Sequence, residues 1–172
     1  MIPPRVWTRP APKINLNVGI GDMVASNDVN ACLITYSLGS CIGVVVYDPV
    51  AKVGGLLHAM LPESNASEAR SEKRPYMYVD TGLPALFHAV YALGGVRSRL
   101  EVKMAGGAEM LNDNKIFNIG PRNVEKAHAI LSRNGVRLHA VDTGGKDVRT
   151  LKLELSSGIL TLSVTGKGSR PL

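Results

Sequence analysis

The chain has 172 residues and a formal net charge of +6, with 45% hydrophobic and 20% charged residues. This length predicts one domain with its own core, and the apolar share excludes a chain that is disordered throughout. Two cysteines are too few for a disulfide framework, so we expect free thiols and a cytoplasmic protein.

The first part of the chain predicts an arm followed by strands. Four prolines before residue 13 indicate an extended arm over residues 1–13. Alternating apolar residues predict a strand that starts at Ile14, and β-branched runs predict two strands on either side of a tight turn at residues 37–40. The uncharged stretch 29–47 approaches the length of a membrane span, but polar residues and glycines divide it into these two strands. We therefore expect no membrane insertion.

The rest of the chain predicts two helices among further strands. One helix starts near Asp80 or Thr81 and ends at Gly94-Gly95, and the other follows Gly120 and ends at Asn134-Gly135. The strands come in clusters rather than in alternation with the helices, which favours an α+β layered fold. We expect a single domain over residues 14–166 and a C-terminal tail at 167–172. The further strands are predicted at 53–61, 100–105, 136–141, 151–155 and 160–164, and 62–80 is a surface loop.

Charge and composition argue against several classes of ligand. The basic residues are scattered and the aromatic residues few (one Trp, five Tyr and two Phe), so the charge favours an acidic protein partner over nucleic acid. The pairs Gly106-Gly107 and Gly144-Gly145 offer backbone donors for an anion, but neither fits a phosphate-binding motif. No cluster of His, Asp or Glu predicts a metal site, and we expect no cofactor.

Cys41 is the candidate nucleophile. It follows Leu38-Gly39-Ser40 and precedes an apolar strand, which places it at a glycine-containing turn. A thiolate is a strong nucleophile when a base or a dipole lowers the pKa of its thiol. The alternative stays open here, because free cysteine is also among the most buried residue types. Cys32 lies inside an apolar strand, and we expect it to be a core residue.

A thiol catalyst needs a base, which is usually a histidine. His88 and His128 fall within the predicted helices and His139 within a strand. His58 lies on the strand that follows the Cys41 strand after a short turn, so a hairpin brings both residues to the same end of a sheet. The alternative for His58 is a core histidine that is satisfied by its neighbours.

Six short motifs accompany these two residues in order. They are L-G-S-C-I-G-V (38–44), Y-D-P (47–49), G-L-L-H-A-M-L-P (55–62), K-M-A-G-G-A (103–108), N-I-G-P-R-N (118–123) and A-V-D-T-G-G (140–145). With them the sequence resembles the CheD family, the chemoreceptor glutamine deamidases of bacterial and archaeal chemotaxis. The resemblance extends from about Ile14 to Val164.

The resemblance implies an enzyme with Cys41 as nucleophile, His58 as base and Thr35 as an assisting residue. Its substrates are glutamines in the cytoplasmic domain of chemotaxis receptors, and some members also deamidate asparagine or hydrolyse receptor methyl esters. It also implies a CheC-type phosphatase as a partner, and a β-sandwich-like core flanked by helices, similar to toxin-type glutamine deamidases. Family members commonly have glycine where Ser37 stands, so we expect a less permissive turn before Cys41.

Two further roles in a cysteine-dependent mechanism are hypotheses. We expect backbone N–H groups of the turn Gly39-Ser40-Cys41 to hold the oxyanion. Thr35 would orient His58 through its hydroxyl or its main-chain carbonyl, and the sequence does not decide between them. Two other functions compete with this one: a non-catalytic binding module that regulates a CheC-like response-regulator phosphatase, and a cysteine protease.

Overall fold

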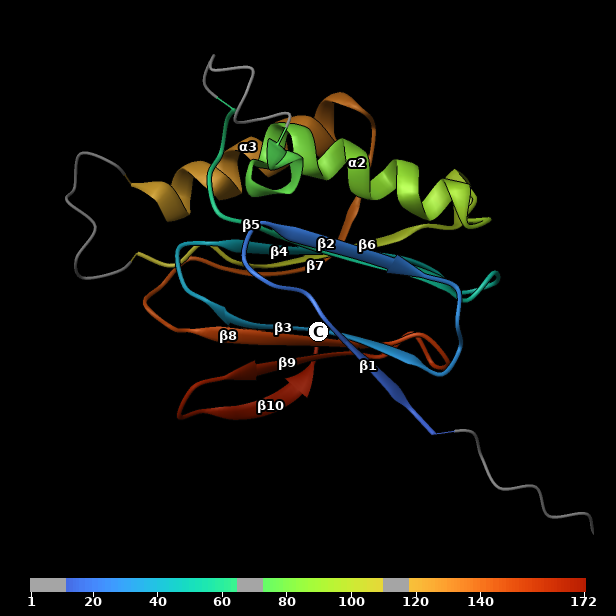
Figure 1. Cartoon of the computed structure of the whole chain (residues 1–172). Helices are drawn as coiled ribbons and strands as arrows, with labels where there is room; N and C mark the ends of the chain where they lie inside the picture. Colours follow the sequence, from blue (N-terminus) through green and yellow to red (C-terminus); the bar gives the residue numbers. More distant parts are fainter. Residues whose placement is uncertain (1–11, 65–72, 110–117) are drawn as a thin grey trace, which may run out of the picture.

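A computed structural model of the chain describes residues 12–64, 73–109 and 118–172. Figure 1 shows three layers, with two helices on one face of a central sheet and a second sheet on its other face. The predicted α+β class is therefore confirmed, with two stacked sheets and helices. Most of the expected N-terminal arm, residues 1–11, lies outside the described residues.

Five strands form the central sheet, and they are β2 (Asp22–Ser26), β4 (Ile42–Asp48), β5 (Val53–Ala59), β6 (Glu101–Gly106) and β7 (Leu138–Thr143). Their order across the sheet is β2-β5-β4-β6-β7. β4 and β5 are buried at every position because one face meets the helices and the other meets the second sheet. The two strands pair antiparallel, so the hairpin expected between Cys41 and His58 is present.

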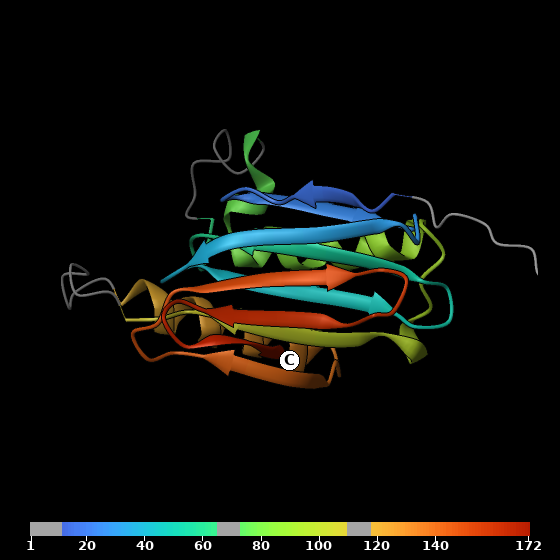
Figure 2. The same cartoon turned by 90° about the horizontal axis from the view of Figure 1, so that it is seen from below.

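The outer sheet holds the two ends of the described chain, and its strands are β1 (Ile14–Asn17), β3 (Ala31–Leu38), β8 (Arg149–Glu154), β9 (Leu160–Val164) and β10 (Gly168–Pro171). Seen from below in Figure 2, it lies in front of the central sheet. The predicted hairpin of β8 and β9 is present. Residues 168–171, expected as a tail, instead pair antiparallel with β9 as an edge strand.

The helices α2 (Val79–Ala92) and α3 (Ile119–Arg133) cover the outward face of the central sheet. Their apolar sides pack with one face of the sheet into a core cluster that includes Leu83, Leu86, Met104 and Leu131. α2 begins at Val79, so the expected cap residues Asp80 and Thr81 lie within its first turn. Short 3-10 turns lie at Pro75–Met77 and Arg97–Arg99. In the described part of the chain, no helix is long and apolar enough to cross a membrane.

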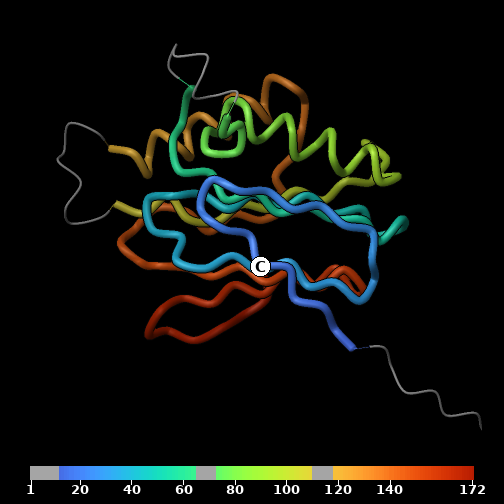
Figure 3. Tube along the Cα trace, viewed as in Figure 1, coloured from blue at the N-terminus to red at the C-terminus, as the bar shows by residue number. Residues whose placement is uncertain are grey.

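The two strands on either side of Cys41 belong to different sheets. β3 pairs with β1 and β8 in the outer sheet, whereas β4 pairs with β5 and β6 in the central sheet. The pairing of β3 with β8 shifts in register between Thr35 and Leu38, and Ser37 adopts a left-handed φ of 59°. This bulge turns the chain out of one sheet and into the other. Figure 3 shows that the crossing lies on the same side of the molecule as the start of α3.

Candidate active site

Cys41 lies where the chain enters the central sheet, directly before the first residue of β4. Its side chain is 9% exposed and belongs to the apolar cluster between the two sheets, together with Leu38, Val45 and Leu56. The thiol therefore combines a position at a turn with a largely apolar environment. The sequence left two interpretations of Cys41 open, a nucleophile at a turn and a core residue. Its position at the turn agrees with the first, and its apolar surroundings agree with the second.

A glycine-rich segment after β6 holds the turn that carries Cys41. The N–H of Gly107 donates to the carbonyl of Cys41 at 2.8 Å, and the N–H of Ala108 donates to the carbonyl of Gly39 at 2.8 Å. Gly106, at a φ of 108°, lies so close that a Cβ there would stand 2.3 Å from the Cys41 carbonyl oxygen. The N–H of Gly144 donates to the carbonyl of Gly106 at 2.9 Å. The N–H groups of Gly107 and Gly144, both considered above as donors to an anion, are therefore occupied by backbone carbonyls.

The register of the β4–β5 hairpin brings His58 next to Cys41. Gly43 pairs with His58, and Cys41 stands two residues before Gly43, so all three share one face of the sheet. Cys41 and His58 are therefore diagonal neighbours, a relation that long side chains can span. The face they share is turned toward the outer sheet, since a Cβ on Gly43 would meet Leu38 and Leu151 at 2.8 Å.

Thr35 reaches the imidazole from the opposite sheet. Its Oγ1 lies 2.7 Å from Nδ1 of His58 and 2.8 Å from the carbonyl oxygen of Val18. A carbonyl accepts only, so the single hydroxyl proton of Thr35 is donated to Val18. The hydroxyl oxygen must then accept from Nδ1–H, which leaves Nε2 of His58 as a bare acceptor. The structure therefore uses the hydroxyl of Thr35, and not its main-chain carbonyl.

Nε2 is the ring atom of His58 that is left without a partner in the described part of the chain. It is buried, and no described residue forms a hydrogen bond with it. The side chains of His58 and Thr35 are both fully buried. A neutral imidazole held with its lone pair on Nε2 is prepared to accept one proton, and the thiol of Cys41 is on the same face of the sheet.

Burial favours the neutral forms of both Cys41 and His58. It lowers the pKa of His58 to about 4, because the charged imidazolium loses its hydration. Burial also raises the pKa of the Cys41 thiol, and the N–H of Cys41 itself opposes that rise. The site therefore holds a thiol and a neutral base at neutral pH, rather than a preformed thiolate and imidazolium.

The expected oxyanion donors are not equivalent. The N–H of Gly39 donates to the carbonyl of Ser37 at 3.0 Å and is occupied. Within the described residues, the N–H groups of Ser40 and Cys41 donate to no other residue. Of the turn predicted for this role, these two groups remain free to bind a developing negative charge.

A buried asparagine contacts the same turn and was given no role in the sequence analysis. Asn123, on α3, is fully buried, and its Nδ2 donates to the carbonyls of Ser40 and Met60, both at 3.0 Å. A signal for it was available, since Asn123 falls one helical turn before Ala127 on the apolar face of the predicted helix. A polar residue on such a face calls for a partner.

The remaining candidates lie away from this site. His88, His128 and His139 are exposed, and Nδ1 of His139 accepts from the N–H of Val102 at 3.1 Å. Cys32 is 1% exposed, in β3, where burial raises the pKa of its thiol. The described residues contain no group of three or more His, Cys, Asp or Glu side chains that would hold a metal ion.

Comparison with known proteins gives consistent matches over most of the chain. A family model described as CheD chemotactic sensory transduction matches residues 60–164. A probable chemoreceptor glutamine deamidase CheD 1 of Syntrophus aciditrophicus is 43% identical over 155 residues, which cover 90% of this chain and 97% of the relative. Similar proteins, each described as a probable chemoreceptor glutamine deamidase CheD, occur in Desulforamulus reducens (44% identical, 88% of this chain and 91% of the relative) and Pyrococcus horikoshii (44% identical, 89% and 94%).

Proposed function

We propose that this chain, which belongs to the CheD family, deamidates glutamine side chains of chemoreceptors with Cys41 as nucleophile and His58 as base. The observation that carries the proposal is the orientation of His58. Thr35 fixes Nδ1–H, and Nε2 is left as a bare acceptor on the face that also carries Cys41. An imidazole oriented by a third group beside a thiol is the arrangement that nucleophilic catalysis requires.

The first half of the reaction forms a thioester. Nε2 of His58 takes the proton of the Cys41 thiol as the sulfur attacks the carbonyl carbon of the glutamine amide. The N–H groups of Ser40 and Cys41 bind the resulting oxyanion. The imidazolium then protonates the amide nitrogen, the carbon–nitrogen bond breaks, and ammonia leaves.

The second half returns the enzyme to its starting state. His58 accepts a proton from water, which attacks the thioester carbonyl, and it returns that proton to the sulfur of Cys41 as the carbon–sulfur bond breaks. Glutamine and water have become glutamate and ammonia, and no cofactor takes part. Since both groups are neutral at rest, the thiolate forms only as the attack proceeds.

The decisive experiment incubates the protein with a cytoplasmic receptor fragment and measures peptide masses. Deamidation adds the small mass difference between OH and NH2 at particular glutamines. Cys41→Ala is expected to abolish this gain, whereas the matched variant Cys32→Ala keeps it. A Cys41→Ala protein as active as the wild type would rule out the nucleophile, and receptor fragments cut at peptide bonds would indicate a protease.

We also propose a CheC-type phosphatase as a binding partner and the cytoplasm as the place of action, both on the family resemblance. The net charge of +6 would suit an acidic partner surface. Co-elution of the purified protein with a CheC-type phosphatase in size-exclusion chromatography tests the partner. If Cys41→Ala has no deamidase activity but still binds the phosphatase, catalysis and binding are separate properties of one chain. Deamidation by the wild-type protein would exclude a purely non-catalytic binding module.

A further inference from the structure

The ladder between β4 and β5 ends beside Cys41 and one residue after His58. The last pair between β4 and β5 is Ile42 with Ala59, so Cys41 and Met60 lie just beyond the paired region. The carboxamide of Asn123 bridges this gap from α3. Its two N–H groups donate to the carbonyls of Ser40, before Cys41, and of Met60, two residues after His58, both at 3.0 Å.

The bridge has a rigid support. α3 approaches the glycine segment so closely that a Cβ on Gly120 would stand 2.3 Å from the carbonyl oxygen of Ala108 and 2.7 Å from that of Gly107. The N–H groups of those same two residues hold the carbonyls of Cys41 and Gly39. The start of α3, the glycine segment and the turn before Cys41 therefore form one connected unit.

The other end of the carboxamide indicates what Asn123 supplies. Its Oδ1 is buried, and no described residue donates to it. An apolar side chain of similar size would cover the sheet without burying an unpaired acceptor, which is unfavourable. Packing alone therefore does not explain an asparagine at this position. The two N–H groups of its carboxamide, which donate to two different carbonyls, do explain it.

We propose that Asn123 is a positioning residue that fixes the distance between Cys41 and His58 by holding the carbonyls of Ser40 and Met60 together. The inference rests on the proposed function, because it assigns Asn123 a role in that reaction. Asn123 touches neither the sulfur nor the imidazole through a hydrogen bond. It acts through the backbone on either side of them.

The test compares three variants in the receptor deamidation assay, with thermal unfolding measured in parallel. Asn123→Leu keeps the branched shape and the number of side-chain heavy atoms and removes both the donors and the unpaired acceptor, so it is expected to fold. Asn123→Asp keeps the shape but sets an oxygen against the two carbonyls. Leu131→Ala, two turns along the same buried face of α3, is the control that weakens packing without touching the turn.

For Asn123→Leu the expected result is a folded but slow enzyme, whereas Asn123→Asp buries a carboxylate against two carbonyls and should also unfold at a lower temperature. Both Asn123 variants should lose about tenfold to hundredfold in kcat, the range expected for reacting groups displaced by an ångström or less, with KM within about twofold. Leu131→Ala should lower the unfolding temperature and leave kcat near that of the wild type. An Asn123→Leu protein with wild-type kcat, or one whose only defect is a raised KM, overturns the inference. If Cys41→Ala were fully active the proposed function itself would fail, so the two failures are distinguishable.

Discussion

Replacing Thr35 with valine removes one hydroxyl from between the sheets and leaves a side chain of nearly the same shape. The hydroxyl has two partners, the carbonyl of Val18 and Nδ1–H of His58, and both are buried. Thr35→Val leaves each without a hydrogen bond, and each orphaned group costs about 1–3 kcal/mol. We expect the free energy of unfolding to fall by about 2–6 kcal/mol.

The same change should slow turnover by a separate route. When His58 takes the proton of Cys41 it becomes an imidazolium, and Thr35 then accepts a charge-assisted bond from Nδ1–H. Such a bond contributes about 1.5–3 kcal/mol, which corresponds to a loss of about tenfold to 150-fold in kcat. Valine also leaves nothing to keep the proton on Nδ1, so Nε2 spends part of its time as a donor.

The assay is the rate of glutamine deamidation under saturating receptor fragment, with unfolding in urea measured on the same preparations. Thr35→Ser is the matched variant, because it keeps the hydroxyl and loses only a methyl group. It should retain most of the turnover. If Thr35→Val turns over as fast as Thr35→Ser while both remain folded, Thr35 does not orient the base and our reasoning about the tautomer is wrong.

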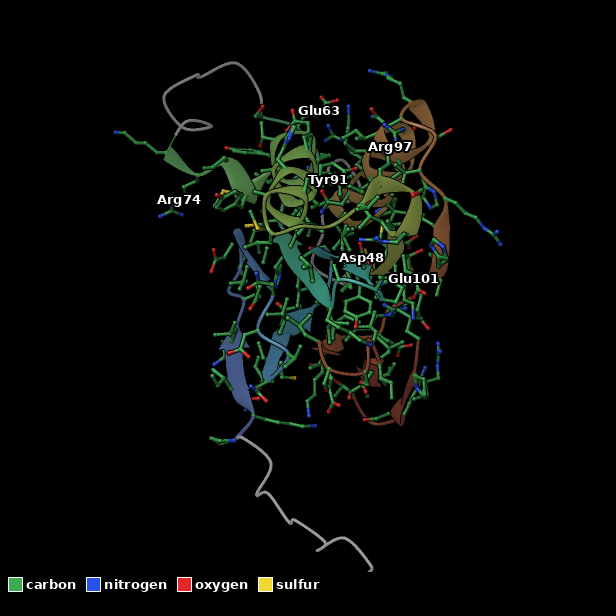
Figure 4. All side chains as sticks on the ribbon, turned by 90° about the vertical axis from the view of Figure 1, so that its right-hand side faces the viewer. Asp48, Glu63, Arg74, Tyr91, Arg97 and Glu101 are labelled. Carbon is green, nitrogen blue, oxygen red and sulfur yellow. The ribbon has the colours of Figure 1, made fainter. Side chains whose placement is uncertain are left out.

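Four further predictions concern His58, Ser37 and Asp48. Because burial lowers the pKa of His58 from 6.5 to about 4, the acid limb of kcat/KM should lie near pH 4, and one near 6.5 would contradict a buried base. The unfolded chain takes up this proton first, so stability should fall by about 3 kcal/mol as the pH drops from 6.5 to 4, measured by urea titration. Ser37→Gly should stabilise the protein by about 0.5–1 kcal/mol in the same titration, since serine is strained at a φ of 59°, whereas an unchanged midpoint would show that the turn carries no strain. Asp48→Asn should destabilise the protein by about 3 kcal/mol, because Asp48 is buried in an ion pair with Arg99. It should leave kcat unchanged, because Asp48 lies at the opposite end of β4 from Cys41. That end of the strand faces the viewer in Figure 4.

The sequence predicted the parts of the site that depend on local order. The turn at Asp48-Pro49 between two apolar strands identified the hairpin, and the positions of Cys41 and His58 on its strands were enough to expect both at one end of a sheet. The register of the hairpin agrees with this expectation. Thr35 was included through the family resemblance, since nothing in its own surroundings marks it.

The parts that depend on contacts across the fold could not be predicted in this way. Nothing near Thr35 in the sequence indicates that β3 joins β8, more than a hundred residues away, while β4 joins β5. The strand Asp22–Ser26 was missed because it is only partly buried and its pattern is weak. The departure at Ser37 was noticed, but its left-handed conformation was not. Asn123 belonged to a motif, yet its partners come from two other segments of the chain.

The origin of Thr35 and His58 in different sheets affects when the chain becomes reactive during its synthesis. The hairpin of Cys41 and His58 can form early, but the outer sheet that carries Thr35 pairs β3 with β8 at residues 149–154. A nascent chain that has not yet released β8 carries a thiol and an imidazole without the hydroxyl that orients them. By the reasoning given for Thr35→Val, such a chain is expected to turn over glutamine about tenfold to 150-fold more slowly than a chain whose two sheets have closed on each other.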